Sequence, residues 1–117
     1  MNTTALGTQA ELFVARQLEA NGFTILEHNY KKKYGEIDLI ASKKELLIFV
    51  EVKMRTTQYF DAAELITLSK QHKIITTAHA YLASEAIDDK NCRFDVALVE
   101  MHNNTFTMIY LSDAFQS

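Results

Sequence analysis

The stretch of sequence that decides the fold is GEIDLIASKKELLIFVEVKMR, residues 35–55. Its first part, Glu36–Ala41, alternates charged and apolar residues and then becomes fully apolar, which is typical of a β-strand. Its last part, Leu46–Lys53, is an apolar run that begins to alternate at its end, which is again typical of a strand. The connection between them, residues 42–45, is short and polar, as in a hairpin. The stretch therefore predicts two antiparallel strands.

Three charged side chains are expected at one end of this hairpin. Side chains alternate faces along a strand, so Glu51 and Lys53 share one face. If the hairpin folds symmetrically about residues 44 and 45, Asp38 lies opposite Glu51. One interpretation is a charged strand end with a cross-strand ion pair. The other interpretation is a metal-binding catalytic site, because the neighbouring apolar run indicates a central strand that would not normally gather charges.

The composition favours one globular domain over residues 1–117, with a single core. A hydrophobic fraction of 48% excludes a disordered chain. No apolar run reaches the roughly 18 residues of a membrane span. No basic-then-apolar signal begins the chain, so we expect a cytoplasmic protein without a membrane partner. The single cysteine, Cys92, excludes an internal disulfide and is expected to be buried, and a net charge of −3 gives no overall attraction to nucleic acid.

The rest of the chain predicts two helices and three more strands. Apolar residues recur at three- and four-residue spacing over residues 3–20 and 68–83, which predicts a helix in each range. Residues 56–67 show no clear periodicity and are expected to form a loop. The further strands are expected at 23–29, 94–101 and 105–111. The predicted order is αβββαββ, and the fold class is α/β, with a mixed central sheet flanked by the two helices.

The charged end of the hairpin has the donor atoms of a divalent-cation site. Mg²⁺ and Mn²⁺ take oxygen ligands and are commonly held by one or two carboxylates. Asp38 and Glu51 would supply such a pair, with the backbone carbonyl of Val52 as a third ligand. Lys53 would orient an attacking water or stabilise charge on a phosphate.

Two helix residues and one basic cluster extend this candidate site. Glu11 falls at the edge of the apolar stripe of the first helix, so its carboxylate could join the metal through a water. Lys70, in the first turn of the second helix, could contact the scissile phosphate. Residues 31–33 are three consecutive lysines, which indicate either a phosphate-binding cluster or a solvated turn. The candidate nucleic-acid contacts are Lys31, Lys32, Lys33, Arg55 and Lys70.

Other polar residues are better explained without a functional role. Asp95 lies in the middle of a predicted strand close to Arg93, and a structural ion pair is expected there. The four histidines are scattered, with no two at ligand spacing within one element, which argues against a zinc site.

The hairpin sequence resembles the signature of the YraN-type family of bacterial proteins, which consists of GEIDLIA, a short turn and LIFVEVKMR in this chain. Shorter matches extend along nearly the whole chain. That family resembles the restriction-endonuclease-like superfamily with the PD-(D/E)-x-K motif, which includes Holliday-junction resolvases. The resemblance implies metal and catalytic positions for Asp38, Glu51 and Lys53. It also makes Glu11 the helix carboxylate and Lys70 the helix lysine.

The resemblance implies a Mg²⁺- or Mn²⁺-dependent nuclease that hydrolyses phosphodiester bonds in DNA, endonucleolytic and structure-selective in its action. The alternative is a non-catalytic nucleic-acid-binding or scaffold protein that retains the fold. The acidic net charge favours this alternative. The intact set of Asp38, Glu51 and Lys53 argues against it. The oligomeric state stays open, a homodimer included.

Overall fold

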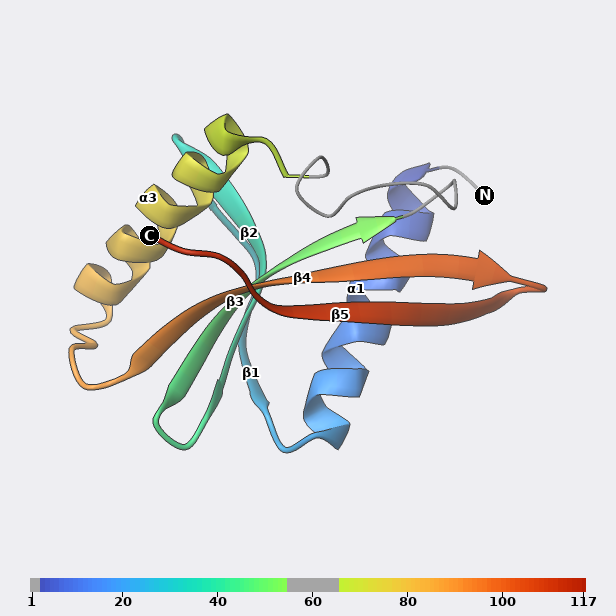
Figure 1. Cartoon of the computed structure of the whole chain (residues 1–117), viewed down its shortest axis with the longest axis horizontal. Helices are drawn as coiled ribbons and strands as arrows, with labels where there is room; N and C mark the ends of the chain where they lie inside the picture. The colour runs from blue at the N-terminus through green and yellow to red at the C-terminus, as the bar shows by residue number, and fades with distance from the viewer. Residues whose placement is uncertain (1–2, 55–65) are drawn as a thin grey trace.

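The structure is a computed structural model that describes residues 3–54 and 66–117 (Figure 1). Its elements are α1 (Thr3–Ala20), β1 (Thr24–Lys32), β2 (Gly35–Lys43), β3 (Leu46–Met54), α3 (Leu68–Ser84), β4 (Asn91–His102) and β5 (Thr105–Phe115). Over the described residues, this order confirms the predicted αβββαββ. Arg55 and most of the loop predicted for 56–67 lie outside the described residues.

The five strands form one mixed sheet in the order β1-β2-β3-β4-β5. Three neighbouring pairs are antiparallel, whereas β3 and β4 run parallel. A parallel pair needs a crossover connection rather than a hairpin, and α3 lies in the segment between these two strands. The predicted α/β class with a mixed central sheet is therefore confirmed, and it is compatible with a nuclease-like α/β fold.

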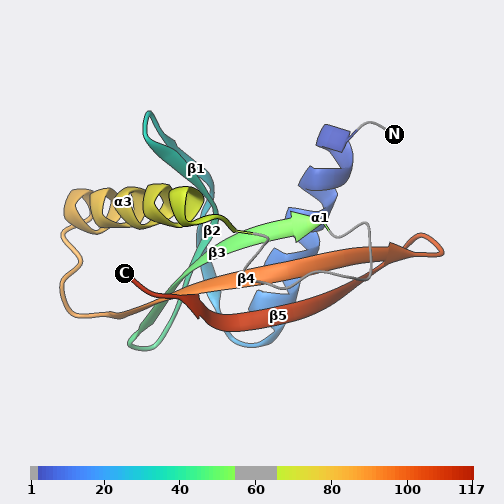
Figure 2. The same cartoon turned by 45° about the horizontal axis from the view of Figure 1, so that its top comes forward.

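The central strand β3 is buried on both faces. Leu47 and Phe49 belong to the core under α3, whereas Ile48 and Val50 belong to the core under α1. The two helices cover opposite faces of the sheet (Figure 2). A strand covered on both faces needs consecutive apolar residues, which explains its apolar run. No helix in the described ranges is both long and apolar enough to cross a membrane.

Several strands are longer than their sequence pattern predicts. β1 pairs with β2 as far as Lys32 and Gly35, so Lys31 and Lys32 belong to the strand rather than to a turn. The backbone pairing of β1 and β2 continues at Lys31 and Lys32, although their side chains are exposed. A strand end without buried side chains has no alternation of apolar and polar residues, so the sequence pattern does not reveal it. β4 likewise begins at Asn91, but its burial begins only at Phe94. Cys92, predicted to be buried, is therefore exposed.

Candidate active site

The charged residues gather where β2 separates from β3. The two strands are paired from Lys43 and Leu46 to Leu39 and Val50, so the hairpin turns where the sequence predicts. In this register Asp38 would be opposite Glu51. We call this point the β2–β3 fork. Here the Val52 N–H donates a hydrogen bond of 2.7 Å to Oδ2 of Asp38. The carboxylate thus accepts a hydrogen bond from a backbone group of β3 beyond the last residue pair of β2 and β3.

The carboxyl groups of Asp38 and Glu51 are both withdrawn from water. Asp38 is 9% exposed and Glu51 is 7% exposed. Burial is the main cause that raises the pKa of Glu51 to about 8, and the charge and hydrogen bonding of Asp38 raise it further. The nearby ammonium of Lys70 lowers the pKa of Glu51, but its effect is the smaller one. Glu51 therefore holds a proton at neutral pH when no cation is bound beside it.

Among the described residues, Lys70 brings a cation into contact with Glu51. Its Nζ lies 3.2 Å from Oε1 of Glu51, and its side chain is 44% exposed. Thr67 caps the start of α3 by accepting a 3.1 Å hydrogen bond from the Lys70 N–H, which places Lys70 in the first turn. Lys70, predicted from the sequence as a contact of the scissile phosphate, therefore contacts Glu51, because α3 begins on the face of the sheet that carries Glu51.

Lys53 lies on the same face of β3 as Glu51, as alternation predicts, and it is partly exposed. Two residues along a strand correspond to about 6.6 Å, so Lys53 lies one side-chain step beyond Glu51. A small cavity of about 220 Å³ opens at the fork, with Asp38, Glu51 and Lys70 in its wall. Lys53 is not among the described residues that line this cavity.

Glu11 approaches the fork from α1, on the opposite face of the sheet from α3. It is partly buried, and burial is the main cause that raises its pKa, followed by the negative charge of Asp38. A hydrogen bond with the side chain of Asn29 acts in the opposite direction. Within residues 3–54 and 66–117, no three Asp, Glu, His or Cys side chains are close enough to form a metal site. Glu11 therefore influences the carboxylate pair without joining it.

The donor set at the fork fits a hard divalent cation. Asp38 and Glu51 offer carboxylate oxygens, and their buried repulsion would be relieved by a cation. Val52 directs its N–H toward Asp38. Because the N–H and C=O of one strand residue point to the same side, the Val52 carbonyl also faces the space that β2 leaves. These are the three ligands that the sequence predicts.

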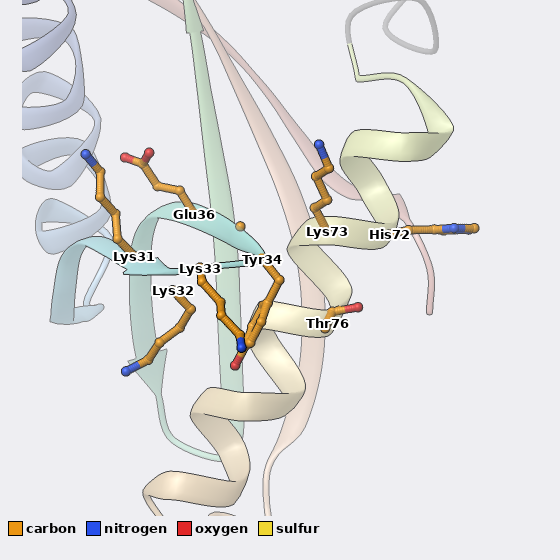
Figure 3. A pocket seen from close by; sticks show the side chains of 9 residues that line it. Lys31, Lys32, Lys33, Tyr34, Glu36, His72, Lys73 and Thr76 are labelled. Carbon is orange, nitrogen blue, oxygen red and sulfur yellow. The ribbon is translucent and has the colours of Figure 1, made fainter.

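The lysine cluster lies at the tip of the β1–β2 hairpin. Lys31 and Lys32 end β1, Lys33 is in the turn, and all three are exposed. Together with α3 the hairpin lines a cleft of about 640 Å³ (Figure 3). The α3 residues in its wall are His72, Lys73 and Thr76. Sequence reasoning missed Lys73, although its three-residue spacing from Lys70 indicates a shared helix face.

Asp95 is structural, as its neighbour Arg93 predicts. It is fully buried, and Arg93 donates two hydrogen bonds of 2.9 Å to its two carboxylate oxygens. The Tyr110 hydroxyl, at 2.6 Å, and the Asp113 N–H, at 2.8 Å, donate two more. These donors satisfy the carboxylate, and two of them come from β5, so they tie β4 to β5.

Comparison with known proteins finds one family model and several relatives that match most of the chain. The model of the uncharacterised protein family UPF0102 matches residues 10–99. A UPF0102 protein of Hahella chejuensis is 42% identical over 111 residues, covering 94% of this chain and 89% of its own length. One from Desulforapulum autotrophicum is 41% identical, covering 96% of this chain and 93% of its own length. One from Francisella tularensis is 42% identical, with 88% of this chain and 91% of its own length covered.

Proposed function

This chain belongs to the uncharacterised protein family UPF0102, and we propose that it is a metal-dependent nuclease that hydrolyses phosphodiester bonds in DNA. We further propose that it is an endonuclease. One observation carries this proposal: two carboxyl groups, each less than a tenth exposed, meet at the β2–β3 fork. Burying two like charges is costly, the Lys70 ammonium offsets this cost only in part, and a bound cation would relieve the rest. A cation site at a cavity open to a lysine-rich cleft suits phosphodiester chemistry.

Each charged residue has a role in this proposal. Asp38 and Glu51, with the Val52 carbonyl, would hold Mg²⁺ or Mn²⁺. When bound, such an ion supplies positive charge that polarises a phosphate and favours ionisation of water. Lys53 orients the attacking water. Lys70 has a half-exposed ammonium that can bind a phosphate oxygen while its helix stays in place.

Residues outside the fork support the reaction in this proposal. Glu11 adds negative charge from the α1 face and thereby favours cation binding. The lysines at residues 31–33 bind the phosphate backbone of the substrate. Arg55, outside the described residues, is proposed to do the same.

The alternative is a non-catalytic nucleic-acid-binding or scaffold protein with the same fold. The net charge of −3 favours it, since most of the surface repels a polyanion. Lysines concentrated at one cleft would still allow binding. The two functions differ in one measurable property, because only the nuclease needs the charged residues at the fork for turnover.

The test is incubation with branched, flapped and linear DNA and with RNA, with and without Mn²⁺. We expect Mn²⁺-dependent cleavage of DNA that Lys53→Ala reduces by about 10²-fold or more, while DNA binding persists. Lys44→Gln, in the turn at the other end of β2 and β3, is the control and should cleave as wild type does. Cleavage of no substrate by wild type would favour the scaffold alternative. A Lys53→Ala protein with wild-type rate would exclude Lys53 from catalysis.

A further inference from the structure

The cavity at the fork and the lysine-rich cleft adjoin each other. Both are lined by Gly35, Glu36 and Lys73, so these residues form their common wall. In Figure 3, Glu36 and Lys73 point to the same side of the hairpin, one from β2 and the other from α3. A chain-like ligand that reaches the carboxylate pair can therefore continue between hairpin and helix. We call the larger part, between the hairpin tip and α3, the basic cleft.

Positive charge is concentrated in the basic cleft. Lys31, Lys32, Lys33 and Lys73 line it, four of the 12 lysines and arginines of a chain whose net charge is −3. Glu36 is the one carboxylate among its described lining residues. A polyanion is therefore attracted to this cleft although the whole molecule is acidic. Successive phosphate groups of a nucleic-acid backbone could contact the lysines on both walls, because the hairpin and α3 each supply lysines.

The cleft also contains an exposed aromatic ring. Tyr34 is 37% exposed at the hairpin turn, and Figure 3 shows its ring beside Lys33, at the level of Thr76. Tyr30 is different, because its ring packs against Tyr81 with centroids 5.1 Å apart. Lysines with an aromatic ring in one groove are the combination that holds single strands, since unpaired bases stack on the ring. A duplex hides the faces of its bases and cannot use Tyr34 in this way.

The hairpin and α3 meet in a tight contact at Gly35, one of the residues that line the cleft. A Cβ atom on Gly35 would lie 2.6 Å from the Thr77 hydroxyl and 2.8 Å from the Lys73 carbonyl, so the hairpin backbone touches α3 there. The cleft is therefore a notch between one hairpin and one helix. Such a notch suits one extended strand better than the wide face of a duplex.

We propose that the basic cleft binds an unpaired DNA strand next to the cleavage point, so that the substrate class is DNA with a single-stranded segment. The part that concerns cleavage rests on the proposed nuclease function. The part that concerns binding stands without it. Tyr34 stacks on a base, and Lys33 and Lys73 bind the backbone from opposite walls.

The first experiment measures binding of a duplex with a single-stranded tail by fluorescence anisotropy, in EDTA, at several salt concentrations. The test protein carries Lys33→Gln and Lys73→Gln, one change on each wall, both at exposed positions. The control carries Arg16→Gln and Lys44→Gln, which remove the same charge from exposed positions outside the cleft. We expect the test pair to reduce the log–log salt slope by about 1.4, because each single-strand contact contributes about 0.7. Equal slopes for test and control proteins would overturn the proposal.

The second experiment separates a single strand from a duplex. Wild type should bind the tailed duplex more tightly than the blunt duplex of the same sequence. Tyr34→Ala should weaken binding of the tailed DNA about tenfold, whereas Tyr34→Phe should retain it, because stacking needs the ring and not the hydroxyl. Equal affinity for blunt and tailed DNA, or equal binding by both Tyr34 variants, would overturn the proposal. Both experiments measure binding and need no cleavage. If the nuclease function is wrong, these binding results are still expected, but no DNA is cleaved with Mn²⁺.

Discussion

At the scale of single residues, the environment of Glu51 separates it from the other glutamates on the strands. Its carboxyl group is buried beside Asp38, and among the described residues its charge is favoured by Lys70, whose Nζ lies 3.2 Å from Oε1 of Glu51. Desolvation and a neighbouring carboxylate both disfavour ionisation, and here they outweigh the lysine. Its pKa of about 8 lies far above the ordinary value of 4.5.

This shift predicts a pH-dependent stability that depends on Glu51. Between pH 4.5 and about 8 the folded state binds more protons at Glu51 than the unfolded state does, so the free energy of unfolding falls as pH rises through this window. Glu51→Gln removes the titrating group. In metal-free urea titrations from pH 5 to 9, the variant should therefore gain stability over wild type as pH rises, on the order of a few kcal/mol.

A matched control for this titration is Glu19→Gln, which changes an exposed glutamate on α1. Its free energy of unfolding should follow that of wild type across the pH range. If Glu51→Gln also runs parallel to wild type, then Glu51 does not keep a proton in the folded protein, and the electrostatic account of the fork is wrong.

At the scale of elements, the β1–β2 hairpin and α3 are held close together by a glycine. Gly35 begins β2, and any side chain there would meet the buried Thr77 hydroxyl and the Lys73 carbonyl. The Thr77 hydroxyl is itself bound to the Lys73 carbonyl, at 2.7 Å, so it has little freedom to move. This contact sets the position of α3, and thereby of Lys70, relative to the fork.

Gly35→Ala should therefore be destabilising. An added methyl group in a tight contact costs about 1–3 kcal/mol, because backbone must shift to admit it. Gly7→Ala is the matched control, since a Cβ there meets nothing within 4 Å and the residue lies inside α1. That change should stabilise the protein by about 0.5–1 kcal/mol through helix propensity. Urea unfolding of both variants measures the difference, and a Gly35→Ala protein at least as stable as wild type would contradict the tight contact.

At the scale of the whole molecule, the fork couples cation binding to folding. A cation that binds only the folded protein stabilises it by RT ln(1 + [L]/Kd), about 1.4 kcal/mol at ten times Kd. For a domain of this size that raises the melting temperature by several degrees. We expect Mn²⁺, and Ca²⁺ as a non-catalytic probe, to produce such a shift in wild type at constant ionic strength.

Asp38→Asn should largely abolish this shift. The amide keeps the size of the side chain and an oxygen for the Val52 N–H, but it removes a charge beside Glu51. Without metal, the variant should melt at or above the wild-type temperature. Asp89→Asn, in an exposed turn, is the control and should keep the full response to both ions. Equal shifts in wild type and Asp38→Asn would mean that any cation binds elsewhere, and the proposed metal site would then be wrong.

The sequence by itself determined the order of the elements and the position of the carboxylate pair. Both follow from local physics. Periodicities of two and of 3.6 residues distinguish strands from helices. A short polar connection between two strands fixes their register, and the observed pairing runs to Leu39 and Val50, one step before Asp38 and Glu51. The ends of the strands were less predictable, because the ladder of β1 continues to Lys32 where no apolar side chain marks it.

Only the tertiary structure decided which lysine meets Glu51, and that the basic cleft adjoins the carboxylate pair. Sequence spacing favoured Lys53, two residues along the same strand, whereas the contact comes from Lys70 on a helix. Where a helix lies over a sheet depends on packing between segments far apart in the chain, such as Gly35 against Thr77. The sequence periodicity of β2 or of α3 does not specify how the two elements pack against each other. The contact between Lys70 and Glu51 therefore follows from the fold and not from the sequence motif.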